Sequence, residues 1–333
     1  MRVSFETMAG EFARVLEARG FRPEDARAAG EIFAGNSLAG VHGHGLLRFP
    51  RLVSYLEKGG IDPLVEPTCT AFFGNMERWD GHRGFGPLNA MKAMDRACEI
   101  AKESGIGLVA LGNNNHWMRG GTYGWQAAEK GCIGICWSNT MPNMPAWGAK
   151  DRRIGNNPLI MAVPRSNGEH VLVDCAMSQF SYGKLENSRL NGQQLPVPGG
   201  YNAEGNLTTD PGEIEQTWRV LPMGYWKGSG LSILMDLIAT ILSGGHSVST
   251  IGTFSEEVGL TQIMIAIDPT KFNTVAETDA IAEQILADLK RSEPIEEDGE
   301  VFYPGERSLK NMKENMQQGI PVVEEVWNTI LKM

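Results

Sequence analysis

Two histidines and two arginines lie within twelve positions near the beginning of the chain. The stretch GVHGHGLLRFPR, residues 40–51, contains His42, His44, Arg48 and Arg51. An H-x-H pair can bind a metal ion when it lies on a strand, where residues i and i+2 share a face. Here glycines flank His44 and no third ligand occurs at a spacing typical of metal sites. The pattern therefore does not favour a metal.

The spacing of His44 and Arg48 suits a different chemistry. If a helix begins near His44, side chains four residues apart lie over the same surface. A guanidinium can then hold the carboxylate of a 2-oxo acid through two parallel hydrogen bonds, and an imidazolium with a pKa near neutrality can donate a proton to the carbonyl oxygen. A polar turn between two helices accounts for the same residues without any function. The residues alone leave both interpretations open.

A second polar cluster interrupts the connection from a predicted strand to a predicted helix. The stretch NNNHWMRGGTYGWQAAEKG, residues 113–131, begins with three asparagines and contains His116, Arg119 and a pair of glycines. These are more polar groups than a simple turn needs, which is typical of a pocket wall. Helix capping uses the same residue types, so the cluster alone does not decide the matter.

Three short stretches could bind an anion or a ribose. Lys227 and two glycines begin a strongly apolar helix predicted over 227–243, and Gly305 precedes another helix with Arg307 nearby. Free N–H groups, the helix dipole and a cation can meet a phosphate at such positions. Asp174 ends a predicted strand, where a carboxylate can accept hydrogen bonds from a ribose. Glycines before helices and capping aspartates are also common where nothing binds.

The glycine motif of a Rossmann nucleotide site, G-x-G-x-x-G, does not occur in the chain. The stretch GFGPLN, residues 84–89, is the most similar, but it lacks the third glycine and follows a polar segment instead of a strand. A dinucleotide that binds to this protein must therefore use another fold.

Length and composition limit the classes of function. The 333 residues are enough for two or three domains, and no apolar run approaches the length of a membrane span. The net charge of −10 argues against nucleic acid or an anionic membrane as the main partner. Five cysteines without a C-x-x-C pair predict neither a disulfide framework nor a cysteine-rich zinc site. The charged first residues do not resemble a signal peptide, so we expect the cytoplasm.

Periodicity predicts helices at both ends of the chain and an α/β region between them. Helices are expected over 5–15, from Pro23 onward, over 47–58, over 87–104 and after about 277, in addition to 227–243. Between residues 68 and 276, β-rich runs such as IGLVAL, CIGICWS and TQIMIAID alternate with helices. We therefore expect a discontinuous helical domain, residues 1–67 with 277–333, and an α/β region, residues 68–276, which could comprise two subdomains.

Several of these motifs together strongly resemble the malate/L-lactate dehydrogenase family of the non-Rossmann type. The likeness covers almost the whole chain, and residues 105–140 (GIGLVALGNNNHWMRGGTYGWQAAEKGCIGICWSNT), 145–164 (PAWGAKDRRIGNNPLIMAVP) and 219–243 (RVLPMGYWKGSGLSILMDLIATILS) carry it. The family implies a mixed, largely antiparallel α/β sheet domain that binds the nicotinamide cofactor without a glycine fingerprint. It also implies a helical domain built from both chain termini.

The resemblance also implies roles for individual residues. His44 matches the catalytic proton donor of the family, and Arg48 and His116 match positions that face the substrate. The positions that match cofactor-binding residues are His170, Val171, Leu172, Val173, Asp174, Cys175, Ala176, Trp226, Lys227, Gly305, Glu306 and Arg307. Members are typically homodimers with active sites near the subunit interface. The implied activity is reduction of a 2-oxo acid, with NADH as the expected cofactor and NADP(H) as the alternative.

Two departures from the family concern the substrate and the cofactor. Gly43 stands where many members have a serine next to the catalytic histidine, and the loop PRSNGEHVL, residues 164–172, is about two residues longer than in close relatives. Malate, lactate, sulfolactate, ureidoglycolate and a cyclic imino acid remain alternative substrates. A metal hydrolase using His42 and His44, or a non-catalytic dinucleotide sensor, would be a different class of protein.

Overall fold

The computed structural model describes residues 1–333, and its first part is helical. Helix α1 (Phe5–Glu17) begins at Ser4, whose hydroxyl accepts a hydrogen bond from the Thr7 N–H. Helix α2 (Pro23–Leu38) begins with proline and two acidic residues, which favour a helix N-terminus. A 3-10 turn, η1 (His42–His44), leads into α3 (Phe49–Glu57), which is shorter than the predicted 47–58. His42 and His44 therefore lie in the connection between α2 and α3.

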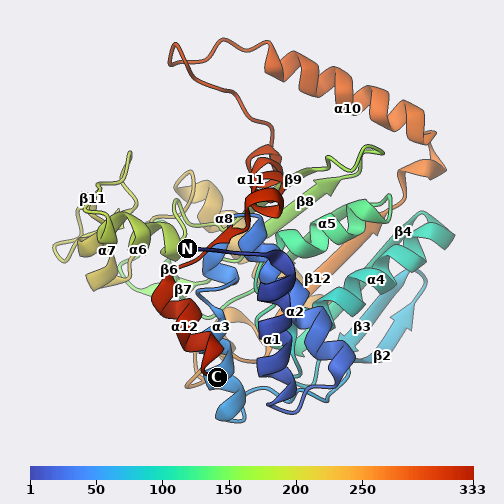
Figure 1. The fold of residues 1–333 in the computed structure, drawn as a ribbon, viewed down its shortest axis with the longest axis horizontal. Helices are drawn as coiled ribbons and strands as arrows, with labels where there is room; N and C mark the ends of the chain where they lie inside the picture. The colour runs from blue at the N-terminus through green and yellow to red at the C-terminus, as the bar shows by residue number, and fades with distance from the viewer.

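A seven-stranded sheet forms the centre of the molecule (Figure 1). Its spatial order is β2 (Thr68–Phe73), β3 (Met76–Asp80), β4 (Ile106–Asn114), β12 (Leu260–Ile267), β5 (Ile133–Ser138), β8 (Leu159–Val163) and β9 (Val171–Cys175). Only β3 and β4 are parallel, and every other neighbouring pair is antiparallel. The expectation of a mixed, largely antiparallel sheet is confirmed. Strand β9 lies at an edge, so one side of its backbone is not paired with another strand.

Helices cover both faces of this sheet. Alternate residues of β12 point to opposite faces, so Met264 packs with α4 (Gly86–Ser104) and α5 (Gly121–Glu129), whereas Ile263 packs in the cluster that contains residues of α8 (Trp226–Ser243). The remaining short elements are β6 (Met144–Pro145), β7 (Arg152–Ile154), α6 (Tyr182–Leu190), β10 (Gly200–Tyr201), β11 (Leu207–Thr208), α7 (Pro211–Thr217), α9 (Val248–Ile251) and η2 (Pro269–Lys271).

The two ends of the chain share one hydrophobic cluster. Strand β1 (Arg2–Val3) pairs with β13 (Ile320–Pro321), and Phe12 contacts both Phe49, with ring centroids 4.2 Å apart, and Trp327 of α12 (Glu324–Leu331). Helix α11 (Glu306–Gln318) also packs against α2. Helix α10 (Val275–Lys290) extends away from this cluster, and only Leu286 of it is buried (Figure 1). No helix has the length and apolar character needed to cross a bilayer.

Gly45 fixes the distance between the histidine loop and α2. A Cβ atom at Gly45 would lie 2.2 Å from the Ser37 Oγ atom and 2.8 Å from the Phe33 carbonyl oxygen, whereas a Cβ atom at Gly43 would meet nothing within 4 Å. The Leu46 N–H donates to the same Ser37 hydroxyl at 2.9 Å. The close approach therefore depends on Gly45 and not on its neighbour.

We expect Gly45→Ala to lower the free energy of unfolding by about 1–3 kcal/mol, because the added methyl group overpacks the contact with α2. Gly43→Ala is the matched control and should change it by less than about 0.5 kcal/mol. Denaturant unfolding of both variants measures the difference. An equal loss of unfolding free energy in Gly45→Ala and Gly43→Ala would contradict the role given to Gly45.

Candidate active site

The loop that carries His44 is held by one buried side chain. Asn36 of α2 is 1 % exposed, and its Nδ2 atom donates to the His44 carbonyl oxygen at 2.9 Å. Its Oδ1 atom accepts a hydrogen bond from the Thr122 hydroxyl of α5, also at 2.9 Å. Asn36 thus connects the loop to the N-terminal helices on one side and to the sheet domain on the other.

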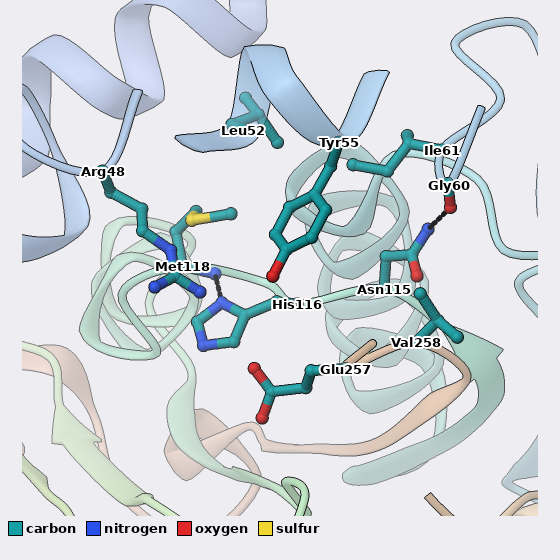
Figure 2. A pocket seen from close by; sticks show the side chains of 10 residues that line it. All are labelled: Arg48, Leu52, Tyr55, Gly60, Ile61, Asn115, His116, Met118, Glu257 and Val258. Atoms are coloured by element: carbon teal, nitrogen blue, oxygen red, sulfur yellow. Dashed lines mark hydrogen bonds between the residues drawn. The ribbon is translucent and has the colours of Figure 1, made fainter. Parts of the chain in front are cut away.

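This anchoring places His44 beside His116, which directly follows strand β4. The two ring centroids are 5.7 Å apart and the ring planes differ by 32°. The His116 Nδ1 atom accepts a hydrogen bond from the Met118 N–H at 2.9 Å, drawn as a dashed line in Figure 2. The neutral His116 ring therefore carries its proton on Nε2 and can donate it to a ligand. His42 takes no part in this pair.

Arg48 and His116 line one cavity, to which two other segments, 60–61 and 257–258, also contribute (Figure 2). The cavity has an empty volume of about 400 Å³ including its mouth. Its lining residues are Arg48, Leu52, Tyr55, Gly60, Ile61, Asn115, His116, Met118, Glu257 and Val258. A guanidinium and an imidazole facing one small cavity form the arrangement expected for a 2-oxo acid, which needs a cation for its carboxylate and a donor for its carbonyl oxygen.

Two polar residues of this cavity were not predicted from the sequence. The Tyr55 hydroxyl accepts a hydrogen bond from Arg51 Nη2 at 2.9 Å, which leaves its own proton free to donate. Glu257 accepts a hydrogen bond from the Met141 N–H at 3.1 Å. Tyr55 lies seven residues after Arg48 on the same helix face, a spacing that could have revealed it. An isolated glutamate in a loop gives no comparable signal.

The surroundings of both histidines disfavour their charged forms. The pKa of His44 is lowered to about 3, first by burial and then by the positive charge of His116, Arg48 and Arg119. The pKa of His116 is lowered to about 3 by burial and by the nearby arginines. Glu257 opposes the shift of His44. His44 is thus neutral at neutral pH in the free protein, which differs from the near-neutral pKa expected from the sequence, because the sequence showed neither how deeply the ring is buried nor how many cations surround it.

Asp174 lies on strand β9, where its carboxylate interacts with Arg119 and with the start of α5. The Asp174 Oδ2 atom accepts a hydrogen bond from the Gly121 N–H at 2.8 Å, at the start of α5. Burial lowers the pKa of Arg119, and the Asp174 carboxylate offsets part of that shift. Of the two roles considered for Asp174, this bond corresponds to capping of a helix start.

The predicted cofactor residues of β9 and of the segment around Gly305 lie together. The Leu172 N–H donates to the Pro304 carbonyl oxygen at 2.9 Å, and Gly305 has a φ of +93°. A Cβ atom at Gly305 would lie 3.2 Å from the Leu172 backbone. Glu306 accepts a hydrogen bond from the Tyr303 N–H at 3.0 Å and contacts Lys290 at 2.6 Å, so its carboxylate stabilises the turn. Arg307 lies over the Phe302 ring at 4.5 Å.

Trp226 and Lys227 begin α8 close to the chain that continues from β9. The Met223 N–H donates to the Met177 carbonyl oxygen at 2.8 Å, which ties the start of α8 to residues just beyond Ala176. Trp226 is 66 % exposed, and Lys227 makes no ion pair.

His170 differs from the other predicted cofactor residues. Its ring is buried, accepts a hydrogen bond from the Arg165 N–H at 3.1 Å and lies 3.1 Å from the Glu129 carboxylate. The His170 ring is therefore satisfied within the protein.

These residues fit a nicotinamide dinucleotide. The glycine at 305 leaves room beside the β9 backbone that a Cβ atom would fill, and Trp226 offers an exposed aromatic surface. Lys227 and Arg307 are cations without a carboxylate partner, as a pyrophosphate requires. By contrast, no group of three or more His, Cys, Asp or Glu side chains is arranged to hold a metal ion.

Comparisons with known proteins agree with this fold. The family model of malate/L-lactate dehydrogenase matches residues 3–331. The chain is 50 % identical over 331 residues to the 2,3-diketo-L-gulonate reductase of Escherichia coli O139:H28, covering 99 % of each protein. It superposes on sulfolactate dehydrogenase from Methanocaldococcus jannaschii with a TM-score of 0.90 at 28 % identity, covering 99 % of this chain and 95 % of that one.

Malate dehydrogenase from Entamoeba histolytica has the same fold, with a TM-score of 0.94 at 24 % identity over 100 % of this chain and 96 % of that one. The full-length family match, the half-identical relative and a cavity that combines His116 with Arg48 all lead to one conclusion. This chain belongs to the malate/L-lactate dehydrogenase family and is an oxidoreductase of 2-hydroxy and 2-oxo acids that uses a nicotinamide cofactor.

Proposed function

We propose that this enzyme reduces 2,3-diketo-L-gulonate to the corresponding 2-hydroxy acid, with NADH as the reductant. The identity of 50 % over the full length to a 2,3-diketo-L-gulonate reductase supports the substrate. The single structural observation that carries the chemistry is a cavity lined by Arg48 and His116, with the His44 ring centroid 5.7 Å from that of His116. The preference for NADH over NADPH rests on the resemblance to family members that use NADH.

Each of the three residues has a distinct role in this proposal. Arg48 binds the substrate carboxylate through its planar guanidinium. The His116 Nε2–H donates a hydrogen bond to the substrate, because its Nδ1 atom is already occupied by the Met118 N–H. A bound nicotinamide cofactor would provide the hydride for the carbonyl carbon, while His44 donates the proton to the carbonyl oxygen.

The low pKa of His44 requires that the substrate itself helps to charge it. In the free protein, Arg48 is among the groups that hold the pKa of His44 at about 3. A bound carboxylate brings a negative charge near the imidazole that offsets the Arg48 charge, which raises the pKa of His44 against the burial that lowers it. The proton donor is therefore formed when the oxo acid binds, and a neutral ligand does not form it.

We also infer a homodimer. Helix α8 presents an apolar row with a spacing of three or four residues, and these side chains are between 42 % and 69 % exposed: Leu231, Leu234, Leu237, Ile238 and Ile241. On the β2–β3 hairpin, Phe72 and Phe73 are 80 % and 81 % exposed. A helix face of this kind normally contacts another protein surface.

All five cysteines are free thiols, which fits the reducing cytoplasm.

Absorbance at 340 nm during incubation with NADH or NADPH and a panel of 2-oxo acids tests the reaction, the cofactor and the substrate together. We expect the highest kcat/KM with NADH and 2,3-diketo-L-gulonate. Higher values with oxaloacetate, pyruvate, sulfopyruvate or a cyclic imino acid would assign the enzyme to another activity of the same family.

Replacing the proton donor tests its role. His44→Asn should lower kcat by about 10²–10⁴-fold, the contribution typical of a general acid, with a smaller effect on NADH affinity. His42→Asn is the matched control, because His42 lies two residues away outside the histidine pair, and it should retain most of the activity. Comparable losses in the two variants would show that the loop and not the His44 ring is what matters.

A further inference from the structure

Glu257 brings a carboxylate without a cationic partner into the substrate cavity. It lies in the connection between α9 and β12, and its Oε1 atom accepts the Met141 N–H at 3.1 Å. It forms no ion pair within 4.0 Å, whereas the adjacent Glu256 lies 3.8 Å from the Lys58 ammonium. Figure 2 shows the Glu257 carboxylate pointing into the cavity toward His116, with the Tyr55 hydroxyl above it. Its position is therefore fixed without an ion pair, and its charge acts on Arg48 across the same cavity.

Glu257 and Tyr55 also line a second cavity. The two cavities share these residues as a common wall, and the second has an empty volume of about 610 Å³ including its mouth. Its other lining residues are mostly polar: Arg51, Ser54, Lys58, Met141, Ser255 and Glu256. A ligand whose carboxylate lies at Arg48 and whose chain is longer than three or four carbons would therefore pass Glu257 and enter a polar space.

The cations near this passage are already engaged. Arg51 donates to the Tyr55 hydroxyl and lies over its ring at 5.5 Å, and Lys58 is near Glu256. An ionised carboxylate only accepts hydrogen bonds, so the ligand group next to Glu257 must be a donor. The buried Oδ1 atom of Asn115, which also has no donor partner, lies in the wall of the first cavity. Hydroxyl groups satisfy such acceptors, and a second anionic group is repelled by them.

We propose that Glu257 is a specificity-determining residue that selects 2-oxo acids with one negative charge and a hydroxylated chain, and disfavours dicarboxylic or sulfonated ones. This inference rests on the proposed 2-oxo acid reductase activity and deepens it. Within one fold, members that act on diacids and members that act on sugar acids would differ in the charge at this position of the cavity. Arg48 and the histidine pair would remain common to both, because every such substrate has the same carboxylate and carbonyl.

The test is Glu257→Gln, which keeps the size of the side chain and the acceptor for the Met141 N–H. The measured quantities are kcat/KM values with NADH for 2,3-diketo-L-gulonate, pyruvate and oxaloacetate. We expect the ratio of diketogulonate to pyruvate to fall about tenfold or more, the typical effect of losing a hydrogen bond to a charged group. The ratio of oxaloacetate to pyruvate should rise. Glu256→Gln should change both ratios less, because Lys58 already pairs with its charge.

Comparing the ratios of kcat/KM between substrates separates an effect on substrate selection from an effect on the catalytic step. If Glu257 acted only through the pKa of His44, all three substrates would lose the same factor and both ratios would stay constant, which would overturn the proposal. Pyruvate activity also reports that the variant is folded. If the wild-type enzyme reduces other oxo acids but not diketogulonate, the proposed substrate fails, while the ratio of oxaloacetate to pyruvate still decides the role of Glu257.

Discussion

The active site depends on a hydrogen-bonded bridge between the helical part of the molecule and the sheet domain. Asn36, buried in α2, donates to the His44 carbonyl oxygen and accepts from the Thr122 hydroxyl of α5. A buried amide that lost either partner would leave a polar group unsatisfied, which costs about 1–3 kcal/mol. The bridge therefore favours one position of the histidine loop relative to the end of β4, where His116 lies. The catalytic geometry is a consequence of how the two parts are joined.

This position of the loop places His44 among positive charges, which a bound anionic substrate would offset. His44 lies among Arg48, Arg119 and His116, and each of them disfavours its protonation. A site that must bind a carboxylate needs this positive charge, yet a proton donor needs the opposite surroundings. In the proposed mechanism, binding of the anion meets both requirements, because its charge offsets that of Arg48 and thereby raises the pKa of His44. Donor formation and substrate recognition would then be coupled, and Glu257 would add a selection for uncharged groups further along the chain.

Much of the fold follows from local sequence patterns. The Ser4 cap, the proline start of α2 and the apolar strand runs predicted elements that the structure confirms within a few residues. The position of β12 between β4 and β5 was not predictable, because strands separated by more than a hundred residues pair through nonlocal contacts. Glu257 could not be predicted for the same reason, because its neighbours in space come from η1, α3 and the end of β4. His44, Arg48 and His116 were visible because each lies in a distinctive local motif.

Proton exchange during binding tests the coupling most directly. Isothermal titration of oxamate, an unreactive analogue of pyruvate, into the enzyme–NADH complex at pH 7 in buffers of different ionisation enthalpy gives the number of protons taken up. Because the pKa of His44 is about 3 in the free protein, that ring is neutral before binding, and we expect an uptake of about one proton. The His44→Asn variant should bind oxamate without this uptake. Binding of oxamate to the wild-type complex with no proton uptake would contradict the formation of the donor by the substrate.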